Sequence, residues 1–498
     1  MDRTFPTAEA FAVRDGRIVE VGGTDEILWL REAEYEIVDL GGRTVIPGFV
    51  DPHNHFAIAA LDCFWADCVE ALSIADIQRN MREAARTTPV GEWVRGWGYD
   101  HARLAERRHP TRHDLDEAVP DRPALLMHFS HHQAVVNSAA LAATSTTRGT
   151  ADPRGGEIAR DKSGEPTGLL FERAMSAAES RSREGWESRF VEVARAASAR
   201  YAEHGITAIQ DAAVTPAMAR RYAEARAAGA LAIHVSEMMV GSRGWFERPD
   251  DAAGGETLKV FVDGGYRCAM RVPRDGGLVT SGFLFYEREE LAALLGAAWR
   301  AGRSVTCHAI GNLGIETAVA AIEDASKTEP DALPRVRIDH AMFLTPDLVR
   351  RIAALGIRLV VQPSFLWDRG AGLPIPGVMR RPFKTTMDAG IPQAFSSDFP
   401  CGSLSPLAGI AAAVTRRSRE GEVADAHEAI GVEAALAAYT LEAARAAGID
   451  GECGSLERGK RADFVVLDAN PLEVDAARLA SVTVDETWVA GARRHRLS

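Results

Sequence analysis

Two histidines separated by one residue, His53 and His55 in the segment DPHNHF, follow directly on an apolar run. If that run is a β-strand, residues two apart project from the same face, so both imidazoles can reach one metal ion. Imidazole nitrogen is a common ligand of zinc and of related divalent ions. A pair of this kind taken alone is more often an ordinary surface or core pair, so its meaning depends on the residues that accompany it.

Four more side chains that can bind a metal or act as a base lie in or beside later apolar runs. They are Lys259 in LKVFVDG, His308 in VTCHAIG, His340 in RIDHA and Asp398 in FSSDFP. A polar group in such a run is costly to bury without a partner. A single residue of this kind is most simply explained as a core polar group with satisfied hydrogen bonds. That explanation would require a coincidence when five runs each carry a residue that can bind a metal or act as a base. The joint pattern predicts a metal site.

The sequence contains eight short β-branched or apolar runs, five of which hold or adjoin these residues. They cover residues 44–51, 205–212, 230–238, 258–265, 304–311, 335–341, 357–364 and 392–400. Between most of them, from the second onward, lie Ala-, Glu-, Arg- and Leu-rich segments with helical spacing, which is typical of a parallel sheet covered by helices. Eight such units favour an α/β fold with a closed (β/α)8 TIM barrel, and an open doubly wound sheet is the alternative. Active sites of such barrels lie at the carboxyl ends of the strands, where His53 and His55 stand.

The remaining segments predict two additions to the barrel, which we expect over residues 44–445. About residues 60–187, between the first two runs, contain their own strand-like pieces and Gly/Pro-rich turns, and we interpret them as an insertion over the barrel mouth. Residues 1–43 and 446–498 contain short alternating strands with Gly-centred turns, which predicts a small β-sandwich built from both chain ends. Met1 stands so close to these strands that we expect the natural start to lie upstream of it.

The composition restricts the partners and the compartment. The chain carries 57 Lys and Arg against 70 Asp and Glu, a formal charge of −13, and has no basic cluster of the kind that binds nucleic acid. Its six cysteines include no CxxC pair, which suits a reducing compartment and argues against a disulfide framework. The sequence has neither a signal-peptide core nor a stretch of about 18 apolar residues. We expect a cytoplasmic enzyme that acts on a small-molecule substrate without nucleic-acid or membrane partners, and a homodimer is left open.

At the motifs described above, the sequence resembles the amidohydrolase superfamily, and within it the amidohydrolase-3 branch, which includes N-substituted formamide deformylase-like proteins. The resemblance covers nearly the whole chain. The segments that carry it are PTAEAFAVRDGRIVEVGG, PGFVDPHNH, FSHHQAVVNSAAL, DPRGGEIARDKSGEPTGLLFE, KVFVDG, HAIGN, RIDHAMFL, SSDFP and GSLERGKRADFVVLD. Together these motifs are specific for the branch, but they do not identify a substrate.

The resemblance implies a site with two metal ions and a modified lysine. It assigns one ion to His53, His55 and Asp398 and a second to His308 and His340, with Lys259, carboxylated by CO2, as the bridge. A free ammonium cannot ligate a cation, whereas a carbamate offers two oxygens. Two zinc ions suit this donor set, with Fe, Mn or Co as alternatives. The implied mechanism uses a metal-activated water, with Asp398 as the general base and then the general acid.

Two positions leave this assignment open. Lys259 is alternatively a strand lysine paired with Asp263, in which case a single ion held by the histidine pair and Asp398 would suffice. The branch usually has Asp after HAIG, whereas this chain has Asn312. That difference removes a negative charge beside the second ion and puts its occupancy in question.

The candidates for substrate binding are a histidine and several aromatic residues. His132 in FSHHQAVVN matches a histidine of the branch, and packing within its loop is the alternative explanation. Trp97 and Tyr99 in GWGYD, and Trp367 after the seventh run, can line an apolar pocket for an aromatic or acyl substrate. Aromatic residues are more often part of the core, so packing is the alternative for these as well.

The favoured function is hydrolysis of an amide, formamide, carbamate or related C–N bond. A metal-dependent decarboxylase or isomerase on the same barrel is the alternative, because one fold supports many reactions. A binding protein without catalytic activity is disfavoured because all six positions carry a suitable residue. The sequence also lacks a GxSxG elbow, a Walker A motif and a dinucleotide-binding fingerprint.

Overall fold

The computed structural model describes residues 7–30, 36–241, 255–274 and 277–497, so parts of the expected N-terminal segment lie outside the described residues. Its centre is an eight-stranded sheet in which all neighbouring strands are parallel. In sheet order the strands are β4 (Phe49–Asn54), β11 (Ile206–Val214), β12 (His234–Met239), β13 (Thr257–Phe261), β16 (Ser304–Ala309), β17 (Val336–His340), β19 (Arg358–Val361) and β21 (Gln393–Phe395).

The first and last strands meet just beyond their ends and nearly close the sheet into a barrel. The amide N–H of Asp398 donates to the carbonyl of His53 at 2.9 Å, and the amide N–H of His55 donates to the carbonyl of Phe399 at 2.8 Å. Each of the eight predicted runs contributes one strand to this sheet. The predicted (β/α)8 barrel is therefore confirmed, and the open doubly wound sheet is wrong.

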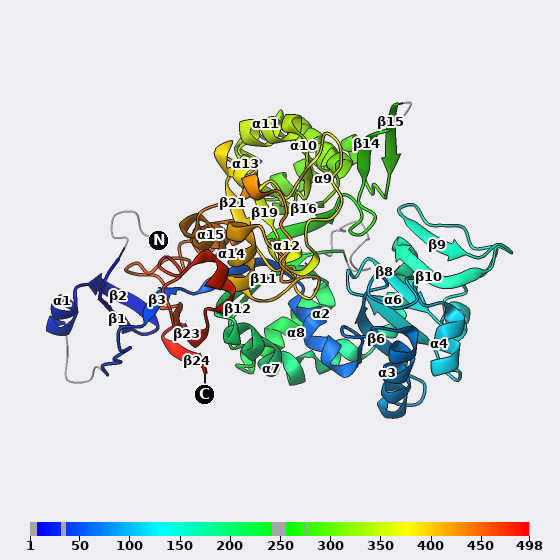
Figure 1. Cartoon of the computed structure of the whole chain (residues 1–498), viewed down its shortest axis with the longest axis horizontal. Helices are drawn as coiled ribbons and strands as arrows, with labels where there is room; N and C mark the ends of the chain where they lie inside the picture. Colours follow the sequence, from blue (N-terminus) through cyan, green and yellow to red (C-terminus); the bar gives the residue numbers. More distant parts are fainter. Residues whose placement is uncertain (1–6, 31–35, 242–254, 275–276, 498) are drawn as a thin grey trace.

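Helices follow the strands and cover the barrel (Figure 1). They are α2 (Phe56–Leu61), α7 (Phe190–Glu203), α8 (Pro216–Ala227), α9 (Arg288–Arg300), α10 (Asn312–Ser326), α11 (Pro346–Leu355), α12 (Ser364–Arg369), α13 (Phe383–Asp388), α14 (Pro406–Thr415), α15 (Val432–Tyr439) and α16 (Leu441–Ala447). Two small antiparallel pairs lie between them, β14 (Met270–Arg274) with β15 (Gly277–Ser281) and β18 (Phe343–Leu344) with β20 (Met379–Arg380). Aliphatic side chains of the strands and helices form one large buried core.

The single strand predicted over residues 44–51 is two strands that belong to different sheets. β3 (Thr44–Pro47) pairs with β22 (Phe464–Leu467), whereas β4 begins two residues later and enters the barrel. Gly48 lies between them and packs so closely on the barrel that a Cβ there would lie 2.3 Å from the Thr207 side chain. Glycine therefore permits the chain to change sheets at this point.

Strands from both chain ends form the predicted small β-domain. β3, β22, β23 (Val484–Val489) and β24 (Ala492–Arg496) make one antiparallel sheet, and β1 (Ala10–Arg14) pairs with β2 (Arg17–Gly22), which α1 (Thr24–Trp29) follows. The Phe11 ring packs edge-on against Phe464 at 5.0 Å, so the hairpin covers one face of the sheet. The strands of this domain lie together on the left in Figure 1. The expected boundaries at 43/44 and 445/446 stay predictions.

The insertion forms a second, smaller sheet with its own core. Its strand order is β5 (Ala66–Asp67), β6 (Val94–Tyr99), β7 (Ala124–His128), β8 (Gln133–Val136), β10 (Pro166–Glu172) and β9 (Gly156–Arg160). The helices α3 (Ile74–Thr87), α4 (Arg112–Ala118), α5 (Ser138–Ala143) and α6 (Ser176–Ser182) accompany this sheet, on the right in Figure 1. Its loops reach the barrel mouth, where Cys401 Sγ lies 3.6 Å from the carbonyl of Ser130.

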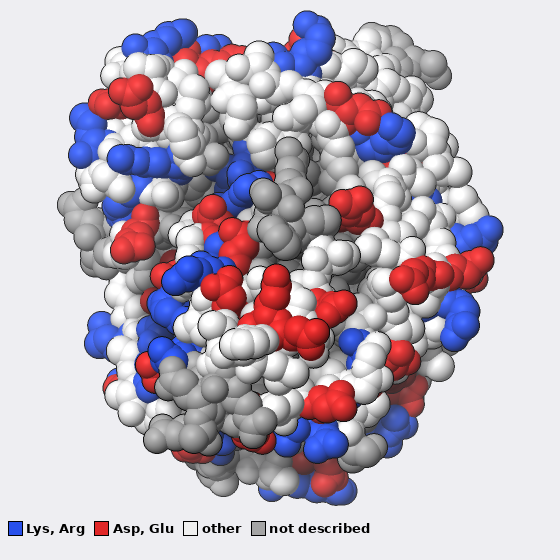
Figure 2. All heavy atoms as spheres, turned by 90° about the vertical axis from the view of Figure 1, so that its left-hand side faces the viewer, with Lys and Arg blue, Asp and Glu red and all other residues white. Residues whose placement is uncertain are grey.

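Basic and acidic side chains are interspersed over the face of the molecule shown in Figure 2. Among the described residues, several oppositely charged side chains pair within one helix, such as Arg350 with Asp347 at 2.8 Å. Within the described residues, no helix combines the length and the apolar character that a membrane crossing requires.

A largely buried group of charged side chains lies within the insertion, beside the end of α2. Arg95 of β6 stacks 4.1 Å above the Trp65 ring and contacts Glu179 at 3.2 Å, and Arg183 contacts the same carboxylate at 2.6 Å. Asp62, just after α2, is also buried, and neither of its carboxylate oxygens has a hydrogen-bond partner among the described residues. Burial raises the pKa of Asp62 to about 8, although Arg183 and Arg95 act to lower it.

This pKa predicts that Asp62 makes stability depend on pH. Because the folded-state pKa lies above the ordinary aspartate value, the contribution of Asp62 is present at low pH and is lost as the pH rises through about 8. Asp62→Asn stays neutral at every pH. Its free energy of unfolding should therefore exceed that of the wild type by an amount that grows with pH and reaches roughly a few kcal/mol near pH 8. Urea unfolding across this range measures the difference. Asp388→Asn, on the exposed end of α13, is the control, and an equal difference at every pH would contradict the prediction.

Candidate metal centre

The six predicted metal ligands converge at the carboxyl end of the barrel. Each is buried, with at most 5% of its surface exposed, and they are His53, His55, Lys259, His308, His340 and Asp398. Five of them lie at or just past the carboxyl ends of their strands, whereas Lys259 lies in the middle of β13. The parallel barrel brings these ends together, although the residues are far apart in the sequence.

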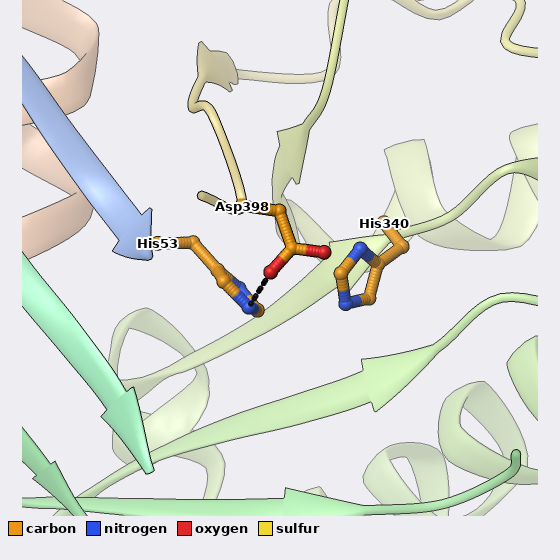
Figure 3. Close-up of side chains that lie close together, drawn as sticks. All are labelled: His53, His340 and Asp398. Atoms are coloured by element: carbon orange, nitrogen blue, oxygen red, sulfur yellow. Dashed lines mark ion pairs between the residues drawn. The ribbon is translucent and has the colours of Figure 1, made fainter. Parts of the chain in front are cut away.

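His53, His340 and Asp398 form the tightest group. Each of the three offers a ligand atom, and these atoms all lie within 4.8 Å of one another. Asp398 Oδ1 lies 3.2 Å from His53 Nε2 and 3.1 Å from His55 Nε2. Figure 3 shows the Asp398 carboxylate between the rings of His53 and His340. One carboxylate and several imidazoles thus face a common point.

The second nitrogen of two of these rings is held by a partner outside the group. His53 Nδ1 donates to Asp339 Oδ2 at 2.5 Å, and His340 Nδ1 donates to Gln362 Oε1 at 2.8 Å. Gln362 Nε2 donates to Ser396 Oγ at 2.9 Å, which fixes the amide so that its oxygen faces His340. A partner of this kind sets the tautomer and the ring orientation of a metal-binding histidine. Both rings therefore direct Nε2 toward the group.

Asp339 is the centre of a charged network beneath the site. Its carboxylate accepts from Lys259 Nζ at 2.9 Å and from Arg337 Nε at 2.9 Å, in addition to His53. Burial acts to raise the pKa of Asp339, but Arg337, Lys259 and His53 hold it well below the usual value. The Arg337 guanidinium also donates to the side chain of Gln210 in β11 and to the carbonyl of Pro52 in β4.

Lys259 pairs with Asp339. The alternative considered above, a pair between Lys259 and Asp263, is therefore wrong. The Asp263 carboxylate accepts the amide N–H groups of Ala269, Ile310 and Gly311 at 2.8–3.0 Å. Lys259 Nζ lies 3.5 Å from Nδ1 of His53, on the side of the ring away from Asp398. Carboxylation stays a prediction.

His308 and His132 extend the group toward the insertion. The His308 ring centroid lies 4.5 Å from that of His340 and 5.5 Å from that of His132. His132 Nδ1 pairs with Glu172 Oε2 at 2.7 Å; burial acts to lower the pKa of His132, but Glu172 raises it above the usual value. A Cβ on Gly265 would lie 2.1 Å from the His132 ring, so this position must be glycine for the ring to fit. A substrate contact by His132 stays a prediction.

The predicted aromatic residues occupy different surroundings. Tyr99 is fully buried in the core of the insertion, and its hydroxyl lies 3.0 Å from His109 Nδ1. Trp97 and Trp367 are partly buried and pack against the main core. The structure thus places Tyr99 with the insertion core and not with the metal-ligand group, and a substrate contact by any of the three stays a prediction.

Three residues of the site have left-handed backbone conformations. The φ angle is 76° at His340, 53° at Asp398 and 49° at Glu172. Such angles are uncommon for residues with a side chain, and they occur most often at functional sites, where surrounding contacts stabilise them. At His340 the angle comes directly at the end of β17, where the imidazole joins the metal-ligand group.

The donor set fits a divalent transition-metal ion. Among the described residues, Nε2 of His308 and Nε2 of His340 have no hydrogen-bond partner although both are buried. Burial lowers the pKa of His55 to about 4 and that of His340 to about 3, so both imidazoles are neutral at pH 7. Burial acts to raise the pKa of Asp398, but His53 and the other histidines hold it well below the usual value. His55 and His340 as neutral imidazoles and Asp398 as an ionised carboxylate are thus in the forms that bind such ions.

Sequence reasoning missed Asp339, Arg337, Gln362 and Glu172. The first two stand in RVRIDH, where three charged residues alternate with apolar ones immediately before a predicted ligand. That alternation is a signal that could have identified them. Gln362 and Glu172 carry no comparable signal, because each gains its role only through a contact between distant segments.

Comparisons with known proteins agree with this geometry. Residues 36–495 match the sequence profile of the Amidohydrolase family. The N-substituted formamide deformylase of Arthrobacter pascens is 32% identical over 99% of this chain and 96% of its own length. The putative amidohydrolase YtcJ of Bacillus subtilis is 30% identical over 98% of this chain and 96% of its own length. An uncharacterized metal-dependent hydrolase from Pyrococcus furiosus superposes with a TM-score of 0.69 at 26% identity, covering 93% of this chain and 95% of its own.

The role of Gln362 leads to a prediction for metal affinity. Gln362→Leu removes the acceptor for His340 Nδ1–H, so zinc affinity should fall by roughly 10–100-fold. Gln362→Glu keeps an acceptor at this position and should retain the affinity. Competition with a chelator measures both variants, and circular dichroism checks their folding. Equal zinc affinity of Gln362→Leu and the wild type would show that the hydrogen bond does not support metal binding.

Proposed function

The chain belongs to the Amidohydrolase family, and on this premise we propose that it is a metal-dependent hydrolase of a C–N bond in an amide, formamide, carbamate or related small molecule. The observation that carries the proposal is the buried group of His53, His340 and Asp398, with imidazole nitrogens and a carboxylate directed at one point. The similarity to an N-substituted formamide deformylase over the full chain supports a formamide or a related amide as the substrate class.

The proposed ligand assignment uses all six positions. His53, His55 and Asp398 would hold one ion and His308 and His340 a second, with carboxylated Lys259 between them. Zinc is the first candidate, and Fe, Mn or Co would suit the same donors. Bound ions of this kind lower the pKa of a ligated water and polarise the scissile carbonyl.

The protein's own groups would then move the proton and orient the substrate. Asp398 is ionised and buried beside the two histidines of the pair, so it can accept the proton of the attacking water and deliver it to the leaving nitrogen. His132, oriented by Glu172, would donate a hydrogen bond to the substrate from the insertion side. Burial of the whole group excludes bulk water and strengthens these interactions.

An assay of the purified metal-loaded protein tests the proposal. Simple N-formyl and N-acyl amines should release the free amine. Asp398→Asn should lower kcat by about 10²–10⁴-fold, because the proton acceptor is lost, whereas Asp388→Asn should match the wild type. Amine production is measured with a fluorescent amine reagent. Release of CO2 from a carboxylic acid substrate without amine formation would favour the decarboxylase alternative and contradict hydrolysis.

Lys259→Ala tests the proposed bridge. If the lysine carries a bridging carbamate, the variant should lose one metal equivalent and most of its activity. Short carboxylic acids such as acetate should partly restore activity by supplying the missing oxygens. Metal content is measured by inductively coupled plasma mass spectrometry. An unchanged metal content would mean that Lys259 serves only as the partner of Asp339.

A further inference from the structure

A second group of metal-ligating side chains lies in the insertion, apart from the residues assigned above. Asp100 and His101 directly follow β6, and His128 is the last residue of β7. These two strands are parallel neighbours, and Tyr99 pairs with His128 in their register. The carboxyl ends of the two strands therefore bring the three side chains together.

The distances between these side chains match those around one ion. The ligand atoms of Asp100, His101 and His128 all lie within 4.8 Å of one another. His101 Nδ1 lies 3.2 Å from His128 Nε2 and 3.9 Å from Asp100 Oδ1. In a tetrahedral zinc site with Zn–N distances of 2.0–2.1 Å, two ligand nitrogens are about 3.3 Å apart. The spacing of the two imidazole nitrogens corresponds to that value.

The outer nitrogen of each ring has a partner, and the two inner nitrogens, His101 Nδ1 and His128 Nε2, share a hydrogen bond that a bound ion would replace. His128 Nδ1 accepts from the Ser130 amide N–H at 3.2 Å and lies 2.8 Å from Ser130 Oγ, and His101 Nε2 lies 3.5 Å from the Tyr266 hydroxyl. This is the arrangement that orients metal-binding histidines. His109 stacks on the His101 ring with 3.8 Å between ring centroids and holds its orientation.

Burial and charge also suit a cation. Burial lowers the pKa of His101 and holds that of His128 well below the usual value, so both rings are neutral at pH 7. His128 is fully buried, whereas about a fifth of the Asp100 and His101 side chains is exposed. An ion can therefore reach the group from solvent on the Asp100 side.

We propose that Asp100, His101 and His128 form an additional binding site for a divalent transition-metal ion, with Zn²⁺ as the reference ion. Two imidazoles and one carboxylate are a recurrent set of protein ligands for such ions, with the remaining position open to water. Tyr266 follows β13 of the barrel and contacts His101. A bound ion would therefore fix the segment after β6 against both the insertion sheet and the barrel mouth.

Metal stoichiometry of the holoenzyme tests this site. The wild type, His101→Ala and His113→Ala are equilibrated with micromolar free Zn²⁺, and bound zinc is measured by inductively coupled plasma mass spectrometry. His113 lies on α4 with 73% of its side chain exposed and serves as the matched histidine control. We expect His101→Ala to bind one zinc fewer per chain than the wild type and His113→Ala to bind the same number. Equal zinc binding by all three proteins would overturn the proposal. The contact between His101 and His128 would then be only a hydrogen bond between two imidazoles.

A second variant and a second measurement keep this result independent of folding. Asp100→Asn preserves the size of the side chain but removes its charge, so it should bind the additional zinc more weakly than the wild type. Circular dichroism of both variants must match that of the wild type. Zn²⁺ added to protein already loaded at the barrel site should raise the Tm of the wild type and of His113→Ala but not that of His101→Ala. A shift of equal size in all three would also overturn the proposal.

Discussion

The buried carboxylate of Asp339 is the interaction on which the rest of the site depends. It contacts two cationic side chains, Lys259 and Arg337, and the outer nitrogen of His53. Through Arg337 the same network reaches β4, β11 and β12. Removing one partner from such a network leaves an uncompensated buried charge, which typically costs about 3–5 kcal/mol. Charged side chains therefore stabilise the interior of the barrel beneath the candidate metal ligands. The same network fixes the orientation of His53.

The positions of the candidate metal ligands at one end of the barrel were predictable because their signal is local. His53 and His55 stand at the end of an apolar run, and His308 and His340 stand at the ends of others. A parallel barrel brings all such ends to one place whatever the order of its strands. The eight strands and their common direction place these strand ends together without any knowledge of individual contacts, whereas the assignment of individual ligands came from the resemblance to the amidohydrolase superfamily.

The partners of the ligands were not predictable because they depend on register and on neighbours. From the sequence alone, Asp339 and Asp263 are equally suitable partners for Lys259. The side-by-side placement of β13, β16 and β17 decides which of the two carboxylates faces it. The division of residues 44–51 into two strands has the same origin, because two sheets compete for adjacent residues and Gly48 permits the change. Local pattern indicates that a segment is a strand, whereas tertiary contacts decide which sheet it joins.

The backbone of the residue proposed to transfer the proton links the first and last strands of the nearly closed barrel. Asp398 donates its amide N–H to His53, so main-chain atoms hold the wall together while the side chain faces the ligands. A hydrogen bond made by the main chain does not depend on the identity of the side chain. Evolution can thus replace the reactive group at this position, and with it the chemistry, without opening the wall. The main-chain hydrogen bond supports the fold, whereas the side chain at this position is free to change with the reaction.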